Sequence, residues 1–308
     1  MGPVSTFPGR LPPITASTSR CRTLIVVTGS TGTIGSELVR LLAAAGADSR
    51  AIYHRAESAS RPPRVSFFRA DLADPTQAEA ALAGGSSLFL LTGNEPGFLD
   101  VQRTVVQAAQ RRGIRHLVKL SALGASDHSK SGIGRDHWVV EQAIQQSTIP
   151  WTMLRPHAFM QNWLKDVAAS VRTENTIYSP IGEGRVPFID TRDIAGVAAQ
   201  VLLHPETHIG KKYVLTGGEA VGYADLATEL TNVTGRAITY RPISMEEARA
   251  RLTRAGQPAE LIDATLAIAA YQRDGGATAM VSPTVERLLG RPPRTIRDFL
   301  RDYAAAFS

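Results

Sequence analysis

The strongest constraint on the fold is a glycine pattern that directly follows a short apolar run. Residues 23–35 read Thr-Leu-Ile-Val-Val-Thr-Gly-Ser-Thr-Gly-Thr-Ile-Gly, and the segment 34–45 repeats apolar residues at helical spacing. This order predicts a strand, a tight turn and a helix. In such a unit Gly29 lets the backbone reverse, Gly32 leaves room for a pyrophosphate, and Gly35 lets the helix pack closely on its strand.

A turn of this kind in front of a helix is a binding site for anions. The first amides of a helix have no partner within it, and the helix dipole is positive at that end. Glycine also occurs in turns for conformational reasons alone, but both the strand and the helix are readable here, which favours a nucleotide site. The candidate contacts come from the loop and the first helical turn: Gly29, Thr31, Gly32, Thr33, Ile34 and Gly35.

The residue that selects the dinucleotide stands after the next apolar run. Residues 50–53 are expected to form the second strand, and Arg55 follows where an NAD-binding unit usually has a carboxylate for the ribose 2′-hydroxyl. A guanidinium instead binds a 2′-phosphate through two charge-assisted hydrogen bonds. The sequence therefore favours NADPH over NADH, with an ordinary surface arginine as the alternative.

Further apolar runs at 65–69, 87–91 and 116–121 alternate with helical segments. This alternation predicts an α/β fold, a Rossmann-type doubly wound parallel sheet with right-handed crossovers. Ligands of such sheets bind beyond the carboxyl ends of the strands. The loops at that edge supply the remaining candidate cofactor contacts: Asp71, Leu72, Leu91, Thr92, Gly93, Ser121, Ala122 and Pro156.

The regular alternation loosens after the sixth predicted strand. We therefore expect a cofactor-binding domain over 23–156 and a smaller substrate lobe over 157–308, partly interleaved with the Rossmann core. Within that lobe the pattern predicts a helix over 159–171 and a hairpin or loop over 177–187. Residues 1–22 contain no acid and several prolines, and are expected to form a disordered leader rather than a transit peptide.

Composition excludes several classes of protein. No apolar window in the 308 residues approaches the length of a membrane span. The net charge of +6 is scattered without an aromatic-interleaved basic stripe, which argues against nucleic-acid binding. Cys21 is the single cysteine, which excludes internal disulfides and predicts a reducing, cytoplasmic location. No metal-ligand spacing is evident, and the expected partners are a small-molecule acceptor and a second copy of the chain in a homodimer.

Six stretches carry a family resemblance: GSTGTIG at 29–35, LVKLSA at 117–122, WTMLRP at 151–156, FMQNW at 159–163, IDTRDIA at 189–195 and LLGRPP at 288–293. Through them the chain resembles the atypical short-chain dehydrogenases/reductases of the NmrA-like family. Within that family it is most similar to bacterial NAD(P)H:quinone oxidoreductases and to azo- and triphenylmethane-dye reductases. The likeness covers nearly everything from Thr23 to the C-terminus.

The chain departs from related dehydrogenases at the helix after the fifth strand. Where those enzymes carry a Tyr-x-x-x-Lys pair, this helix has His137 and Glu141. His137 has two interpretations: an acid near neutral pH that protonates or hydrogen-bonds the reduced acceptor, or a structural group paired with Glu141. Ser121 ends the fifth strand beside the expected nicotinamide, and is a candidate for contact with the cofactor and for a part in the chemistry.

The acceptor site has its own candidates. His137 would face the acceptor, and Phe159, Met160 and Trp163 could form an aromatic wall against a flat molecule. Core packing is the alternative for each of these last three side chains.

The resemblance implies an NADPH-dependent reductase that transfers hydride to a planar, electron-poor small molecule such as a quinone or dye. The alternative is a catalytically silent NAD(P)-sensing regulatory protein. A lysine-dependent reductase of the same broader group is a third interpretation. Lys119 lies on the preceding strand, which leaves Lys130 as the expected source of such a lysine.

Overall fold

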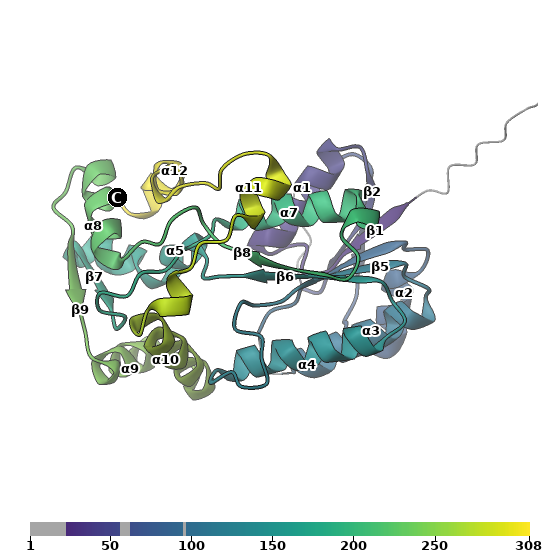
Figure 1. Cartoon of the computed structure of the whole chain (residues 1–308), viewed down its shortest axis with the longest axis horizontal. Helices are drawn as coiled ribbons and strands as arrows, with labels where there is room; N and C mark the ends of the chain where they lie inside the picture. Colours follow the sequence, from purple (N-terminus) through teal and green to yellow (C-terminus); the bar gives the residue numbers. More distant parts are fainter. Residues whose placement is uncertain (1–22, 56–61, 95–96) are drawn as a thin grey trace, which may run out of the picture.

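The computed structural model describes residues 23–55, 62–94 and 97–308, and its centre is a seven-stranded sheet (Figure 1). Its strands are β1 (Leu24–Val27), β2 (Asp48–Tyr53), β3 (Val65–Arg69), β4 (Ser87–Leu90), β5 (His116–Leu120), β6 (Trp151–Pro156) and β8 (Lys211–Leu215). Their order is β3-β2-β1-β4-β5-β6-β8, and every neighbouring pair is parallel. This is the doubly wound Rossmann order with one further strand at the edge, so the expected α/β fold is confirmed.

Helices cover both faces of this sheet (Figure 1). On one face α1 (Thr33–Ala44) packs against α7 (Thr191–Leu203). On the other face lie α2 (Pro75–Leu82), α3 (Phe98–Arg111) and α4 (Gly132–Gln146), which pack side by side. Each layer closes over its own hydrophobic core, as expected for a sheet buried on both sides.

Strand β5 shows how the two cores divide the side chains. Neighbouring residues of a strand point to opposite faces, so Val118 and Leu120 join the core beneath α1 and α7, whereas Leu117 joins the core on the side of α4. Lys119 and Ser121 share the face of Leu117. The alternation therefore brings one charged and one hydroxyl side chain toward α4.

The rest of the chain forms a smaller lobe around a third core. Its strands β7 (Thr176–Ser179) and β9 (Thr239–Pro242) pair in parallel. Its helices are α5 (Trp163–Asp166), α6 (Ala168–Glu174), α8 (Tyr223–Thr234), α9 (Met245–Arg254), α10 (Ala259–Arg273) and α12 (Ile296–Asp302). Between the last two, α11 (Thr284–Leu289) returns to pack on α7 and β8. Because β8 is a strand of the central sheet and α7 packs on that sheet, the two halves of the chain are interleaved.

One local prediction in this lobe is wrong, and for a second segment the structure decides between two alternatives. The segment 159–171 is broken into η1 (Met160–Asn162), α5 and α6 rather than one helix, and the backbone leaves regular helical geometry at Val167. For the segment 177–187, predicted as a hairpin or loop, the hairpin is excluded because β7 pairs with the distant β9, and a loop follows β7. That pairing joins residues about sixty positions apart, which no local pattern specifies. The predicted leader, 1–22, lies outside the described residues.

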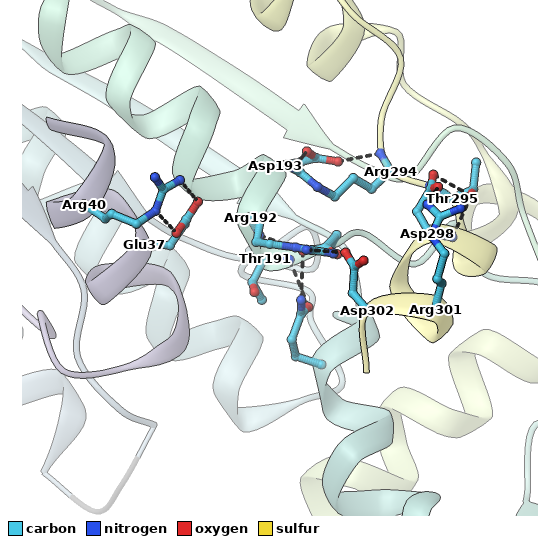
Figure 2. A network of polar contacts seen from close by, with 12 residues as sticks. Glu37, Arg40, Thr191, Arg192, Asp193, Arg294, Thr295, Asp298, Arg301 and Asp302 are labelled. Atoms are coloured by element: carbon cyan, nitrogen blue, oxygen red, sulfur yellow. Dashed lines mark hydrogen bonds and ion pairs between the residues drawn. The ribbon is translucent and has the colours of Figure 1, made fainter. Parts of the chain in front are cut away.

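A set of ion pairs fastens the C-terminal segment to α7 (Figure 2). Asp190 caps this helix by accepting a hydrogen bond of 2.8 Å from the amide of Arg192, whose guanidinium also pairs with Asp302 at 2.6 Å. The carboxylate of Asp193 is fully buried and accepts hydrogen bonds from the amide and the guanidinium of Arg294. Asp190 thus caps the helix, and Asp193 positions the segment that follows α11.

Candidate active site

The glycine loop is held rigidly between two strands. Gly29 has φ +62°, the left-handed conformation that glycine adopts most readily. On its two sides, Thr28 Oγ1 donates to the carbonyl oxygen of Leu91 at 2.8 Å, and Ser30 Oγ donates to the carbonyl oxygen of Ile52 at 2.7 Å. The loop is therefore tied to the ends of both β4 and β2.

The helix after the loop approaches it too closely for any side chain. A Cβ atom added to Gly35 would lie 2.1 Å from the carbonyl oxygen of Gly29, and one added to Gly29 would lie 2.8 Å from the carbonyl oxygen of Leu91. At Gly32 the nearest atom would be 3.4 Å away, an ordinary contact. Gly29 and Gly35 are thus demanded by packing, whereas Gly32 leaves its Cβ position almost open.

The N-terminus of α1 is suited to an anion. Among the described helices, α2, α7, α9 and α12 are capped by the side chains of Asp74, Asp190, Ser244 and Thr295. The N-cap of α1 is Gly32, with no side-chain cap and no acid in the first turn. Its amides keep their donors free, and the helix dipole adds positive potential there. The residues present therefore fit a pyrophosphate, which Thr31, Gly32, Thr33, Ile34 and Gly35 would hold.

Arg55 lies where the sequence places it, directly after β2, with an exposed side chain. Among the described residues it has no ion-pair partner, so its guanidinium is available to a 2′-phosphate. The neighbouring acid Asp71 is in a loose pair with His54, at 3.9 Å between Nε2 and Oδ2. These features fit NADPH at this edge of the sheet.

The other candidate cofactor residues all lie along the same edge. Asp71 and Leu72 follow β3, Leu91, Thr92 and Gly93 follow β4, Ser121 and Ala122 follow β5, and Pro156 ends β6. Thr92 is fixed in place by the buried Gln102, whose side-chain amide donates a hydrogen bond of 2.8 Å to Thr92 Oγ1. The parallel sheet thus collects loops that are far apart in sequence into one row.

Beneath this row Glu141 organises a buried ionic cluster. Its carboxylate, with no exposed surface, accepts two hydrogen bonds from Arg155, at 2.8 and 2.6 Å, and one from Ser121 Oγ at 2.6 Å. Lys212 Nζ lies 3.4 Å from the same group. Burial alone would raise the pKa of Glu141, but these hydrogen bonds and positive charges outweigh it and hold the pKa below its usual value.

A second buried pair joins Lys119 of β5 to His137, which lies one helical turn before Glu141 on α4. Lys119 Nζ is 3.2 Å from Nδ1 of His137 and donates to the carbonyl oxygen of Leu120. The ring of Phe98 packs edge-on against the imidazole, with 4.9 Å between centroids. Lys119 has no exposed surface and His137 is 6% exposed. Both side chains are therefore removed from bulk water.

Burial dominates the protonation of this pair. It lowers the pKa of Lys119 to about 7, against a partial opposing effect of the Glu141 charge. Burial, helped by the charge of Lys119, lowers the pKa of His137 to about 2. His137 is thus a neutral imidazole at physiological pH, while Lys119 titrates near neutrality.

Of the three residues proposed for the acceptor wall, two lie deep in the small lobe. Trp163 is 1% exposed and packs against Phe188 and Phe299 with centroids 4.8 and 5.6 Å away, and Met160 belongs to the same core. Core packing explains both. Phe159 is only partly buried, and bridges to Ile189 at the edge of the large domain.

A model of the NmrA-like family matches residues 22–299. This chain belongs to the NmrA-like family. It is 37% identical to an NAD(P)H azoreductase of Xenophilus azovorans, over 92% of this chain and 99% of the relative. Among solved structures it is similar to the quinone oxidoreductase QOR2 of Escherichia coli in complex with NADPH, with a TM-score of 0.80 at 26% identity, covering 91% of this chain and 99% of that one. The Citrobacter sp. triphenylmethane reductase in complex with NADP(H) gives the same TM-score and identity, covering 90% and 99%.

The geometry of this NmrA-like chain corrects two sequence-based interpretations. His137 is not paired with Glu141, because the strands supply other partners for each: Lys119 for the imidazole, and Arg155 and Ser121 for the carboxylate. Nor is His137 an acid with a pKa near neutrality, because burial keeps it uncharged. It therefore meets the acceptor as a neutral imidazole, whose N–H can donate a hydrogen bond or give up its proton.

The sequence favoured Lys130 as the lysine of the site, but the structure places Lys119 there. Lys130 is exposed in the loop before α4, whereas Lys119 is the lysine that reaches His137. A signal for Lys119 exists in the sequence: it interrupts the apolar strand His-Leu-Val-Lys-Leu and stands two residues before Ser121, hence on the same face. Arg155 carries a similar signal, at the end of an apolar strand.

Two kinds of site are absent from the part of the chain that the structure describes. No helix there is long and apolar enough to cross a membrane. No group of three or more His, Cys, Asp or Glu side chains there is arranged to hold a metal ion.

Proposed function

We propose that this protein is an NADPH-dependent reductase that transfers hydride to a quinone or to an azo or triarylmethane dye. Bound NADPH supplies the hydride; the chain supplies the site that holds the dinucleotide and the groups that meet the reduced acceptor. The names of the relatives support this substrate class. The uncapped N-terminus of α1, and Arg55, which has no ion-pair partner among the described residues, support the choice of cofactor.

The observation that carries the proposal is the orientation of the His137 ring. Its Nδ1 is occupied by Lys119, while within the described residues Nε2 has no hydrogen-bond partner. Nε2 is not completely buried, so it can reach solvent. A protonated lysine can only donate, which places the ring proton on Nε2. The site therefore offers a neutral N–H donor to an oxygen or nitrogen that gains negative charge on reduction.

The experiment is a turnover assay with quinones, azo dyes and triarylmethane dyes, each with NADPH and NADH. We expect turnover with NADPH, and about a 10²-fold lower kcat in His137→Ala, because a positioned proton donor contributes at least that much. NADPH affinity, measured by calorimetry, should change little. His128→Ala is the matched control, since that side chain is 91% exposed, and it should behave as the unmodified protein.

The same assay tests the regulatory alternative. A silent sensor would bind oxidised and reduced cofactor and reduce none of the acceptors, with or without His137. Binding without turnover across the panel would therefore replace the reductase by the sensor.

Two further expectations from the sequence stay predictions. A homodimer would give twice the chain mass by light scattering, and a cytoplasmic location would be seen by fractionation of the cells that make the protein.

A further inference from the structure

Lys119 is an unusual residue for the interior of a sheet. It stands in the middle of β5 with no exposed surface, and the ion pairs of the described residues join it to no carboxylate. A fully buried lysine without an acidic partner costs stability, because an ammonium loses its hydration and gains no ion pair. Such an arrangement favours a functional explanation over a structural one.

The surroundings of Lys119 define what it can do. Its ammonium touches the Leu120 carbonyl and His137 Nδ1, and it lies 5.5 Å from the centre of the Phe98 ring. The Glu141 carboxylate, whose charge acts on Lys119 without a hydrogen bond between them, is occupied by Arg155 and Ser121, and Lys212 also faces it. Among the described residues that contact Lys119, the imidazole of His137 is therefore the group that can take up a proton.

A neutral imidazole alone would be a poor acid at this site. If Nε2 gave up its proton unaided, an imidazolate would remain in a buried, apolar surrounding. If the ring instead held two protons, the buried imidazolium would be equally unfavourable, as the low pKa of His137 shows. Both charged states are avoided if a proton enters at Nδ1 while another leaves at Nε2.

We propose that Lys119 is a positioning residue that supplies this proton, so that Lys119 and His137 form a two-proton relay to the reduced acceptor. The inference rests on the proposed function. After the hydride reaches a quinone, the acceptor carries one extra electron pair and a negative oxygen. The Nε2–H bond breaks as a new O–H bond forms, and a Lys119 N–H bond breaks as an Nδ1–H bond forms. The quinone becomes a hydroquinone, the imidazole stays neutral with its proton on the other nitrogen, and the lysine becomes a neutral amine.

The relay resets from the solvent side. Lys119 is enclosed, so its proton must return through His137: water protonates Nε2, and the Nδ1 proton passes back to Lys119. The pKa of Lys119 near 7 makes its reprotonation from solvent nearly balanced in free energy at neutral pH. The sign of the pH dependence follows: the donor form of Lys119 exists below its pKa, so turnover falls as pH rises above about 7.

The first test measures the protonation state and tautomer of His137 in the protein without cofactor. In ¹⁵N-histidine NMR we expect His137 to remain neutral from pH 5 to 9, with its proton on Nε2 while Lys119 is charged. Lys119→Met keeps the length of the side chain without a proton, and should release the ring into a mixture of tautomers. An unchanged His137 spectrum in Lys119→Met would overturn the positioning role.

The second test reads turnover with a quinone and NADPH. Lys119→Met should lower kcat by about 10²-fold, flatten the fall above pH 7, and abolish the two-proton solvent isotope dependence expected of the unmodified protein. Lys119→Arg keeps a charge that cannot be given up, so it should be as slow as Lys119→Met. Lys130→Met, an exposed lysine of the neighbouring loop, is the control and should keep full turnover.

The outcomes separate the inference from the proposed function. If the unmodified protein reduces no acceptor, the proposed function fails, while the NMR experiment still decides whether Lys119 sets the tautomer of His137. If the unmodified protein turns over and Lys119→Met retains its kcat and pH profile, the relay is wrong and the reductase stands. NADPH binding by calorimetry and circular dichroism confirm that each variant is folded.

Discussion

Replacing Gly35 with alanine tests whether close backbone contact shapes the dinucleotide site. The new Cβ would lie 2.1 Å from the carbonyl oxygen of Gly29 and 2.9 Å from Cα of Ser30, both backbone atoms that no side-chain rotation can move. Ordinary contact begins near 3.4 Å. The loop and α1 must therefore separate by roughly 1 Å in an interior that is otherwise close-packed.

The cost has two parts. Overpacking of this size destabilises a protein by about 1–3 kcal/mol, so we expect the free energy of unfolding without cofactor to fall by about 2 kcal/mol. The displaced loop also misplaces the amides of α1. In the unmodified protein, NADPH at a hundred times its Kd should add about 2.7 kcal/mol to the free energy of unfolding, and Gly35→Ala should lose most of that gain.

The assay is urea unfolding with and without NADPH, compared with two control glycines. Gly32→Ala has ordinary contacts in the cofactor-free fold, so its stability without NADPH should change by less than about 0.5 kcal/mol, yet its methyl group should weaken NADPH binding. At Gly132 the nearest atom would be 3.9 Å away, and Gly132→Ala should leave both quantities unchanged. If Gly35→Ala unfolds like the unmodified protein and retains the NADPH gain, the contact does not constrain the site.

Two further predictions concern charged residues of the site. Glu141→Gln leaves Arg155 without its carboxylate and should lower the free energy of unfolding by about 3 kcal/mol near neutral pH. Because the folded pKa of Glu141 lies below its usual value of 4.5, the stability it contributes is present above that value and is lost as pH falls through the folded pKa. The difference between the two proteins in urea unfolding should therefore close on acidification, and a constant difference would contradict the ion pair. Arg55→Asp should shift the cofactor preference from NADPH toward NADH, because a carboxylate repels a 2′-phosphate; unchanged kcat/KM ratios for the two cofactors would remove Arg55 from this role.

The sequence was most informative where structure follows from local rules. The strand β3 begins and ends where the apolar run 65–69 places it. The helix predicted over 159–171 failed because aromatic and apolar residues there serve the core of the lobe rather than one face of a regular helix. Trp163 shows the difference: it packs against Phe188 and Phe299, contacts that depend on the folded lobe.

By itself, the sequence determined the strand–glycine–helix unit, the parallel sheet and the arginine after β2, because each depends on residues that are neighbours along the chain. Only the tertiary structure decided which side chains form hydrogen bonds and ion pairs beneath the cofactor site. The sequence spacing of His137 and Glu141 suggested that they pair with each other. In the structure the strand register instead brings Lys119 to His137 and Arg155 to Glu141. A charged group in a low-dielectric interior takes whichever partner the packing brings within hydrogen-bond distance, and that distance is fixed by the sheet and not by the helix alone.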